Sequence, residues 1–169
     1  GCALDMPVVV APMAFHCLVN PEGELATMKA VEDNHLGMVV STMSSVSLEE
    51  IALRRRRALL WFQLYLYKEK KITESLIRRA ERAGYQAIVV TVDVPVMGRR
   101  YNDMRSQFSL PVNLMAANVP EEVALELHSK NMNSSIKNFT DKFFKKSVTL
   151  DDIAWIKSIT SLPVIVKGL

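Results

Sequence analysis

Residues 87–105 read Ala87-Ile-Val-Val-Thr-Val-Asp-Val-Pro-Val-Met-Gly-Arg-Arg-Tyr-Asn-Asp-Met-Arg105, and they change from a buried strand to a charged loop within a few positions. The nearly continuous β-branched run up to Val92 is typical of a parallel strand that is covered on both faces. Thr91 and Asp93 place polar groups at its carboxyl end, where parallel α/β folds bind their ligands. Taken alone, a capped strand followed by solvated arginines explains this stretch equally well, so its neighbours must decide.

The composition is that of a soluble globular domain. The chain has 169 residues, of which 49% are hydrophobic and 23% charged, and this suffices for one sizeable core. Its net charge of +3 is unevenly spread, with −6 over residues 1–53 and +8 over residues 54–105. The basic runs Arg54–Arg57 and Arg78–Arg82 lie on or just after amphipathic helices without interleaved aromatic residues. They therefore predict solvated helix faces and no nucleic-acid partner.

Cysteine content and hydropathy exclude several classes of protein. Cys2 and Cys17 provide neither a disulfide framework nor metal-ligand spacing, which fits a reducing compartment. No apolar run approaches the roughly 20 residues of a membrane span. No signal peptide opens the chain, which begins with Gly, and we expect that both ends are cut from a longer chain.

Strand patterns and helix patterns alternate along the chain, which predicts parallel strands joined by right-handed crossovers. Helix boundaries are marked by an Asn20 cap with Pro21 in the first turn, a capping box from Ser47 to Glu50, and Gly84 just past a helix end. The segment of about residues 95–147 lacks such a pattern and is too long for an ordinary connection, so it predicts an irregular lid or insertion. The predicted strands cover residues 8–11, 37–41, 59–65, 87–92 and 163–168, and the predicted helices cover 21–34, 48–54, 72–83 and 150–158.

A doubly wound sheet would show the same alternation, but no Gly-x-Gly-x-x-Gly turn follows any strand. A barrel is favoured because polar residues recur at the carboxyl ends of successive strands, where they can converge on a ligand. We therefore expect an α/β fold of the TIM (β/α)8 barrel class, incomplete with about five βα units, and with a long insertion after the fourth strand. The polar residues are Ser41, Gln63 with Tyr65, Thr91 with Asp93, and Lys167.

Eight short motifs stand in order along the chain: Ala11-Pro-Met-Ala14, Pro21-Glu-Gly-Glu24, Ser47-Leu-Glu-Glu50, Trp61-Phe-Gln-Leu-Tyr65, Arg78-Arg-Ala-Glu-Arg-Ala-Gly84, Thr91-Val-Asp93, Gly98-Arg-Arg100 and Ser161-Leu-Pro-Val-Ile-Val-Lys-Gly168. In sequence and spacing they resemble the FMN-dependent α-hydroxy acid oxidases and dehydrogenases, the family of glycolate oxidase, lactate oxidase and mandelate dehydrogenase. The resemblance extends from about Met6 to the last residue and is weakest across residues 112–145.

The resemblance implies FMN as cofactor. Backbone groups of Ala11, Pro12, Met13 and Ala14 would lie against the flavin ring near its reactive nitrogen. The side chains of Ser41, Gln63 and Thr91 would hydrogen-bond the polar edge of the flavin from rigid strands. The ammonium of Lys167 would stand beside the pyrimidine end of the ring and stabilise the negative charge of the reduced flavin.

The resemblance also implies oxidation of an L-2-hydroxy acid to a 2-oxo acid. Arg100 would clamp the substrate carboxylate through its planar bidentate guanidinium, and Tyr65 would hydrogen-bond the hydroxyl or carboxylate. Asp93 would orient its neighbours. Met43 stands where glycolate oxidases usually carry a tryptophan, so the substrate pocket is expected to differ. The partners implied are a small 2-hydroxy acid and an electron acceptor, which is oxygen, a quinone or a cytochrome.

Two parts of the family's site are not found in the sequence. The base is a histidine of an Asn-His-Gly turn after the sixth strand, and the phosphate site follows strands seven and eight. No catalytic residue is therefore assigned here, and the base is expected beyond Leu169. His16 near the barrel mouth, His35 at a helix end and His128 on the lid surface are not substitutes. Residues 1–169 are expected to form a partial FMN-dependent barrel domain that is inactive alone.

Two further interpretations remain open. The chain could be a non-catalytic half-barrel or remnant with at most a flavin-binding or interaction role, or another FMN or phosphate-ligand barrel with different chemistry. An unfinished barrel would expose its outer strands, which predicts poor solubility or assembly with a second copy or a complementary half. By resemblance, the full-length parent is expected to be a homo-oligomer in the cytoplasm or the peroxisome.

Overall fold

The computed structural model describes residues 4–128 and 135–169, and its centre is one sheet of five parallel strands in the order β1-β2-β3-β4-β5. The register pairs Val9 with Gly37, Val40 with Phe62, and Thr91 with Lys167. All five predicted strands are thereby confirmed, with slightly shorter bounds. The strands are β1 (Val9–Val10), β2 (Gly37–Val40), β3 (Leu59–Leu64), β4 (Ile88–Thr91) and β5 (Val164–Lys167).

The burial of the strands follows their position in the sheet. Every residue of the inner strands β2 and β4 is buried, as their continuous apolar sequences predict, whereas β1 and β5 are half-buried. In the part of the chain that the structure describes, β1 and β5 each have one strand neighbour, so the sheet is open on two sides. This arrangement is that of a partial (β/α)8 barrel.

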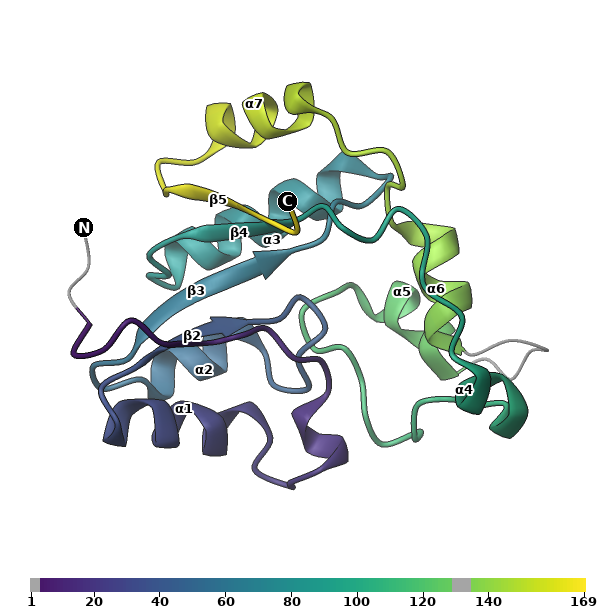
Figure 1. Cartoon of the computed structure of the whole chain (residues 1–169), viewed down its shortest axis with the longest axis horizontal. Helices are drawn as coiled ribbons and strands as arrows, with labels where there is room; N and C mark the ends of the chain where they lie inside the picture. Colours follow the sequence, from purple (N-terminus) through teal and green to yellow (C-terminus); the bar gives the residue numbers. More distant parts are fainter. Residues whose placement is uncertain (1–3, 129–134) are drawn as a thin grey trace.

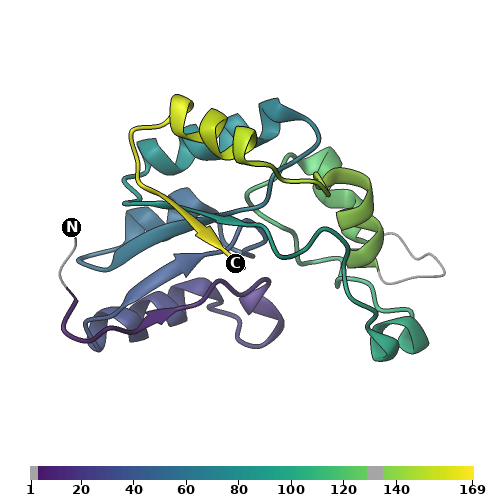
Figure 2. The same cartoon turned by 45° about the horizontal axis from the view of Figure 1, so that its top comes forward.

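Four helices follow strands and cover the outer side of the curved sheet (Figures 1 and 2). They are α1 (Glu24–Asp33), α2 (Leu48–Arg54), α3 (Lys70–Arg82) and α7 (Leu150–Ile159). Gly84, with φ of +79°, ends α3 in the left-handed conformation that the sequence predicts, and the Thr149 capping box opens α7. Among the described residues, none of the helices is both long and apolar enough to cross a membrane.

Helix α1 begins three residues later than the sequence predicts. The Asn20 side chain does cap a backbone N–H, that of Glu22 at 2.8 Å, but within a local turn rather than a helix. Gly23 then adopts a φ of +54°, and the helix starts at Glu24. Only half of the predicted capping box is present at α2, where Ser47 Oγ accepts from the Glu50 N–H at 3.1 Å.

The sequence predicts an irregular insertion over residues 95–147, but the structure shows several short helices there. The insertion contains α4 (Tyr101–Ser106), α5 (Glu121–Ala124), the 3-10 helix η2 (Leu125–His128) and α6 (Ser135–Phe143), gathered at the carboxyl end of the sheet (Figure 1). These helices are short, and α4 and α5 begin without a side-chain cap, so they carry weak sequence signals. An antiparallel bridge between Tyr67 and Phe144 fastens the end of the insertion beside β3. Residues 129–134 of the predicted lid lie outside the described residues, as does Cys2.

The basic runs are partly neutralised by acids on neighbouring helices. Arg79 on α3 donates two hydrogen bonds to the Glu49 carboxylate on α2, at 2.7 and 2.9 Å. Arg56 donates through Nε to Glu32 of α1 at 3.2 Å. These arginines thus tie adjacent outer helices together.

Candidate functional site

A cavity of about 520 Å³ opens at the carboxyl ends of the strands. Strand ends and the loop after β1 line one side of it, and the insertion lines the other. It therefore lies where parallel barrels place their ligands. Its lining comprises Pro12, Met13, Ala14, Phe15, Leu18, Ser41, Met43, Gln63, Tyr65, Thr91, Val94, Met97, Arg100, Asp103, Phe108, Ile136, Thr140, Phe144 and Lys167.

Gln63 is the centre of a polar network across three strands. Its side chain is almost fully buried and donates through Nε2 to Thr91 Oγ1 at 3.1 Å, while Oε1 accepts from the Thr42 N–H at 3.2 Å. Ser41 Oγ lies 3.4 Å from the same Oε1, at the outer limit of a hydrogen bond. The network holds the Gln63 amide in one orientation, and the described structure shows no acceptor for its second Nε2 hydrogen.

Lys167 comes beside this network because β5 pairs with β4 in a register that places it opposite Thr91. Its ammonium lies 3.6 Å from the Asp93 carboxylate, and both side chains are partly exposed. Of the two, Lys167 lines the cavity. Gly168 follows with φ of +102°, and a Cβ at this position would lie 2.5 Å from Asp93. The close passage of the chain past Asp93 thus requires glycine.

Tyr65 is oriented by the insertion. Its ring stacks on Phe144 with a centroid distance of 4.6 Å and an interplanar angle of 22°. Burial raises the pKa of the Tyr65 phenol, the negative charge of Asp93 raises it further, and the positive charge of Arg100 partly offsets both. The phenol is therefore protonated at neutral pH and available as a hydrogen-bond donor into the cavity.

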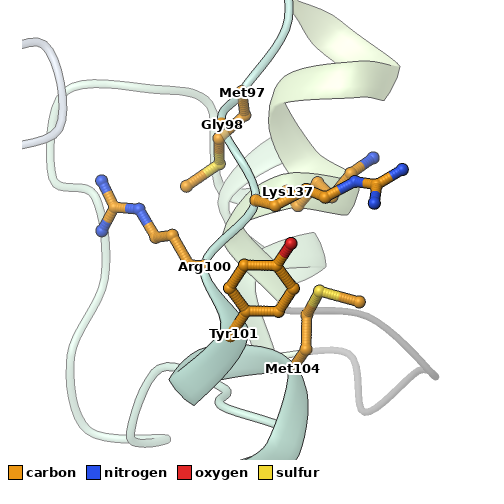
Figure 3. Close-up of a pocket in the computed structure, with 7 residues that line it drawn as sticks. Met97, Gly98, Arg100, Tyr101, Met104 and Lys137 are labelled. Atoms are coloured by element: carbon orange, nitrogen blue, oxygen red, sulfur yellow. The ribbon is translucent and has the colours of Figure 1, made fainter.

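Arg100 belongs to the exposed segment between β4 and α4. A second depression, of about 420 Å³, adjoins the first and shares Met97 and Arg100 with it. Figure 3 shows Arg100 extending away from Tyr101 and Lys137, which lie on the other side of the segment. The guanidinium is thus separated from the second depression's other polar groups and remains available to the main cavity.

The wall opposite the strand ends is largely apolar. The insertion contributes Met97, Phe108, Ile136 and Phe144 to it, beside the polar side chains of Arg100, Asp103 and Thr140. Met43, which is 5% exposed, adds an apolar side chain on the strand-end side. A ligand in this cavity would therefore meet the hydrogen-bonding groups of the strand ends on one side, and on the other a mainly apolar surface interrupted by Arg100, Asp103 and Thr140.

The cavity brings together nearly all of the residues that the sequence singled out. Ala11 and Asp93 are the exceptions, since neither belongs to the lining. Sequence reasoning missed the contributions of Phe108, Ile136, Thr140 and Phe144. A signal existed for three of them, because Ile136, Thr140 and Phe144 recur every four residues along α6 and its end, which is the spacing of one helix face. Phe108 has no such signal. The predicted residues in the lining are Pro12, Met13, Ala14, Ser41, Gln63, Tyr65, Thr91, Arg100 and Lys167.

The three histidines lie outside the cavity lining. His16 is buried, with Nδ1 3.0 Å from Thr27 Oγ1, and His35 follows the end of α1 as predicted. The assignment of His128 to the lid surface is wrong, because the ring is half-buried with Nδ1 3.1 Å from the Leu110 carbonyl oxygen. Within the described ranges, no group of three or more His, Cys, Asp or Glu side chains could hold a metal ion.

The sequence and the fold of this chain are similar to those of known flavin-dependent proteins. The sequence model described as FMN-dependent dehydrogenase matches residues 1–169. L-lactate oxidase of Nostoc is 40% identical over the whole of this chain and 47% of its own length, and glycolate oxidase 2 of Oryza sativa subsp. indica is 40% identical over the whole of this chain and 45% of its own. A solved structure of mandelate oxidase with (S)-4-hydroxymandelic acid superposes with a TM-score of 0.90 at 42% identity, covering 98% of this chain and 46% of that one. The chain thus spans less than half the length of these relatives.

Proposed function

The chain belongs to the FMN-dependent dehydrogenase family, and from this premise we propose that its cavity holds the flavin ring of FMN with a 2-hydroxy acid beside it. The complete enzyme would oxidise the hydroxy acid to a 2-oxo acid. The observation that carries the proposal is the convergence of Gln63, Thr91, Lys167, Tyr65 and Arg100 on one cavity.

The donor set at the strand ends fits the flavin. In the described structure the second Nε2 hydrogen of Gln63, the Thr91 hydroxyl proton and the Lys167 ammonium are available as donors toward the cavity, which suits the carbonyl-rich edge of the ring. When bound, FMN supplies an acceptor for the two electrons of the oxidation. Lys167 contributes a positive charge where the reduced ring carries a negative one, and Asp93 orients that ammonium.

The two remaining polar groups fit the substrate. The Arg100 guanidinium can bind a carboxylate with two parallel hydrogen bonds, and the protonated Tyr65 phenol can donate to the same carboxylate or to the hydroxyl. Lactate, glycolate and mandelate, the acids in the relatives' names, share this carboxylate with an adjacent hydroxyl and differ in the third substituent. In this chain that substituent would face the apolar wall.

The remainder of the reaction lies outside the described cavity. None of the three histidines lines it, so the base is proposed to come from a part of the enzyme beyond this chain. We further propose oxygen as electron acceptor, because the relatives named above are oxidases, and a cytoplasmic or peroxisomal location, because a relative from Arabidopsis thaliana is described as peroxisomal. A homo-oligomeric parent remains a prediction of the family resemblance.

Titration of the chain with FMN tests the cofactor assignment. We expect saturable quenching of flavin fluorescence, and a loss of affinity of about tenfold in Lys167→Met, which corresponds to one charge-assisted hydrogen bond. Lys157→Met, an exposed lysine on α7, is the matched control and should bind like the wild type. Equal affinity of all three proteins would contradict the placement of Lys167 beside the ring.

The substrate assignment is tested on the flavin-loaded chain. Lactate, glycolate or mandelate should perturb the visible absorbance of the bound flavin, and Arg100→Leu should abolish the perturbation without changing FMN affinity. This result separates a hydroxy acid site from a simple flavin binder, which has no use for a carboxylate clamp. Perturbation of equal size in Arg100→Leu would contradict the role of Arg100 as the carboxylate clamp, and no perturbation of the wild type would favour the non-catalytic alternative.

A further inference from the structure

The fully buried side chain of Asn118 lies behind the cavity wall and not in its lining. It belongs to the insertion, yet its hydrogen bonds run to the end of β2. Nδ2 donates to Ser44 Oγ at 2.7 Å and lies 3.2 Å and 3.3 Å from the carbonyl oxygens of Ser41 and Thr42. Oδ1 accepts from the Leu48 N–H at 2.7 Å. One amide therefore satisfies groups along the whole connection from β2 to α2.

The backbone of Asn118 is held as firmly as its side chain. Arg79 on α3 donates to the Asn118 carbonyl oxygen, and Arg79 is itself fixed by its two hydrogen bonds to Glu49. The Ala117 N–H donates to the Ser44 carbonyl oxygen at 2.9 Å. This part of the insertion thus docks on two outer helices and on residues 41–44 together.

Residues 41–44 connect the docked part of the insertion to the cavity. Ser41 and Met43 line it, and Ser41 Oγ accepts from the Met43 N–H at 3.0 Å. The Thr42 hydroxyl donates to the Gln63 carbonyl oxygen at 2.6 Å, and the Met43 carbonyl accepts from the Phe15 N–H at 3.1 Å. A shift of this connection would move the strand-end donors and the loop after β1 together.

We propose that Asn118 is a positioning residue for the flavin site, and that it couples the docking of the insertion to the geometry of the strand ends. The identity of the ligand rests on the proposed function, whereas the role of Asn118 in docking the insertion on residues 41–44 does not. Because the insertion also supplies Phe108 and Ile136 to the opposite wall, Asn118 sets both walls of the cavity relative to each other. By the reciprocity of coupled equilibria, a ligand between the walls stabilises the docked insertion as much as docking favours the ligand.

The test uses Asn118→Leu, which keeps the branched shape and the number of heavy atoms but removes every hydrogen bond of the side-chain amide. It also uses Asn118→Asp, which keeps the acceptor for the Leu48 N–H and loses the donors. Two controls match it. Asn113→Leu makes the same chemical change at an exposed position of the same segment. Val119→Ala shortens the buried neighbouring side chain and removes no hydrogen bond to residues 41–44.

The first measurement is backbone hydrogen exchange. In Asn118→Leu we expect the Leu48 and Ala117 amides to exchange at least about tenfold faster, because each loses its partner or the support of that partner. Asn118→Asp should accelerate Ala117 more than Leu48. Both controls should leave the exchange rates of these two amides unchanged relative to those of the other core amides. Unchanged exchange in Asn118→Leu, or an equal effect in Val119→Ala, would overturn the proposal.

The second measurement is FMN binding by the same proteins. Asn118→Leu should weaken FMN binding about tenfold or more and shift the absorbance of the bound flavin, whereas a merely structural role would lower stability without a spectral shift. FMN should also slow exchange in residues 110–127 of the wild type and not of Asn118→Leu. Failure of the wild type to bind FMN would count against the proposed function, while the exchange experiment would still decide the role of Asn118.

Discussion

Glu32 on α1 provides a sharp test of how the chain stabilises the approach to β3. Its carboxylate is 3% exposed and accepts from the backbone N–H groups of Arg56, Arg57 and Ala58 at 2.7, 2.8 and 3.1 Å. Burial alone would raise the pKa of Glu32, but these three donors and the Arg56 guanidinium lower it from 4.5 to about 2. The carboxylate therefore replaces the hydrogen-bond partners that the segment between α2 and β3 lacks in the sheet.

Glu32→Gln should lower the free energy of unfolding at pH 7 by about 2–3 kcal/mol. A pKa depressed by about 2.5 units corresponds to roughly 3 kcal/mol of preferential stabilisation of the charged form, and the amide oxygen of glutamine retains a part of the hydrogen bonding. Because the folded pKa is depressed, this stability is fully present above pH 4.5 and is lost as the pH falls toward 2. The difference between wild type and variant should shrink over the same window.

Urea denaturation followed by far-UV circular dichroism at pH 7, 5, 4 and 3 measures this difference. Glu74→Gln is the matched control, because Glu74 is half exposed and lies 3.8 Å from Arg78 in a surface pair on α3. Its removal should cost less than about 0.5 kcal/mol. The reasoning would be refuted if Glu32→Gln were as stable as the wild type at pH 7, or if its deficit stayed constant down to pH 3.

Two further substitutions test the site's support and a helix end. Phe144→Ala should lower the free energy of unfolding by about 3–4 kcal/mol and weaken the near-ultraviolet circular dichroism signal of Tyr65, on which Phe144 stacks. The control Phe143→Ala removes a less buried ring and should lower the free energy of unfolding by less. Equal effects of the two substitutions would contradict the role of the Tyr65 stack. Gly84→Ala should lower the free energy of unfolding, measured by thermal denaturation, by about 1 kcal/mol, because the residue has φ of +79°. Gly98→Ala, at a position with open space around it, should be neutral or slightly stabilising. Unchanged stability of Gly84→Ala would show that α3 can end without the left-handed residue.

The local signals that the sequence read correctly are those with a short-range physical cause. The buried strands β2 and β4 are continuous apolar runs, and Gly84 ends α3 because a left-handed residue must follow it. The Asn20 cap failed as a helix boundary because an asparagine can close a turn as readily as a helix, and the chain's choice depended on Gly23 three residues later. In the insertion, α4 and α5 lack side-chain caps, so their sequence carries little information about them.

The sequence by itself determined the alternation of strands and helices, and with it the ends at which Ser41, Gln63, Thr91 and Lys167 would stand. Strand period and chain direction suffice for that, since parallel strands with right-handed crossovers must present their carboxyl ends together. Only the tertiary structure decided what lies opposite these residues. The contacts of Phe144 with Tyr65 and of Asn118 with residues 41–44 join positions more than 70 residues apart, and such pairings leave no periodicity in the chain because they depend on where the insertion docks.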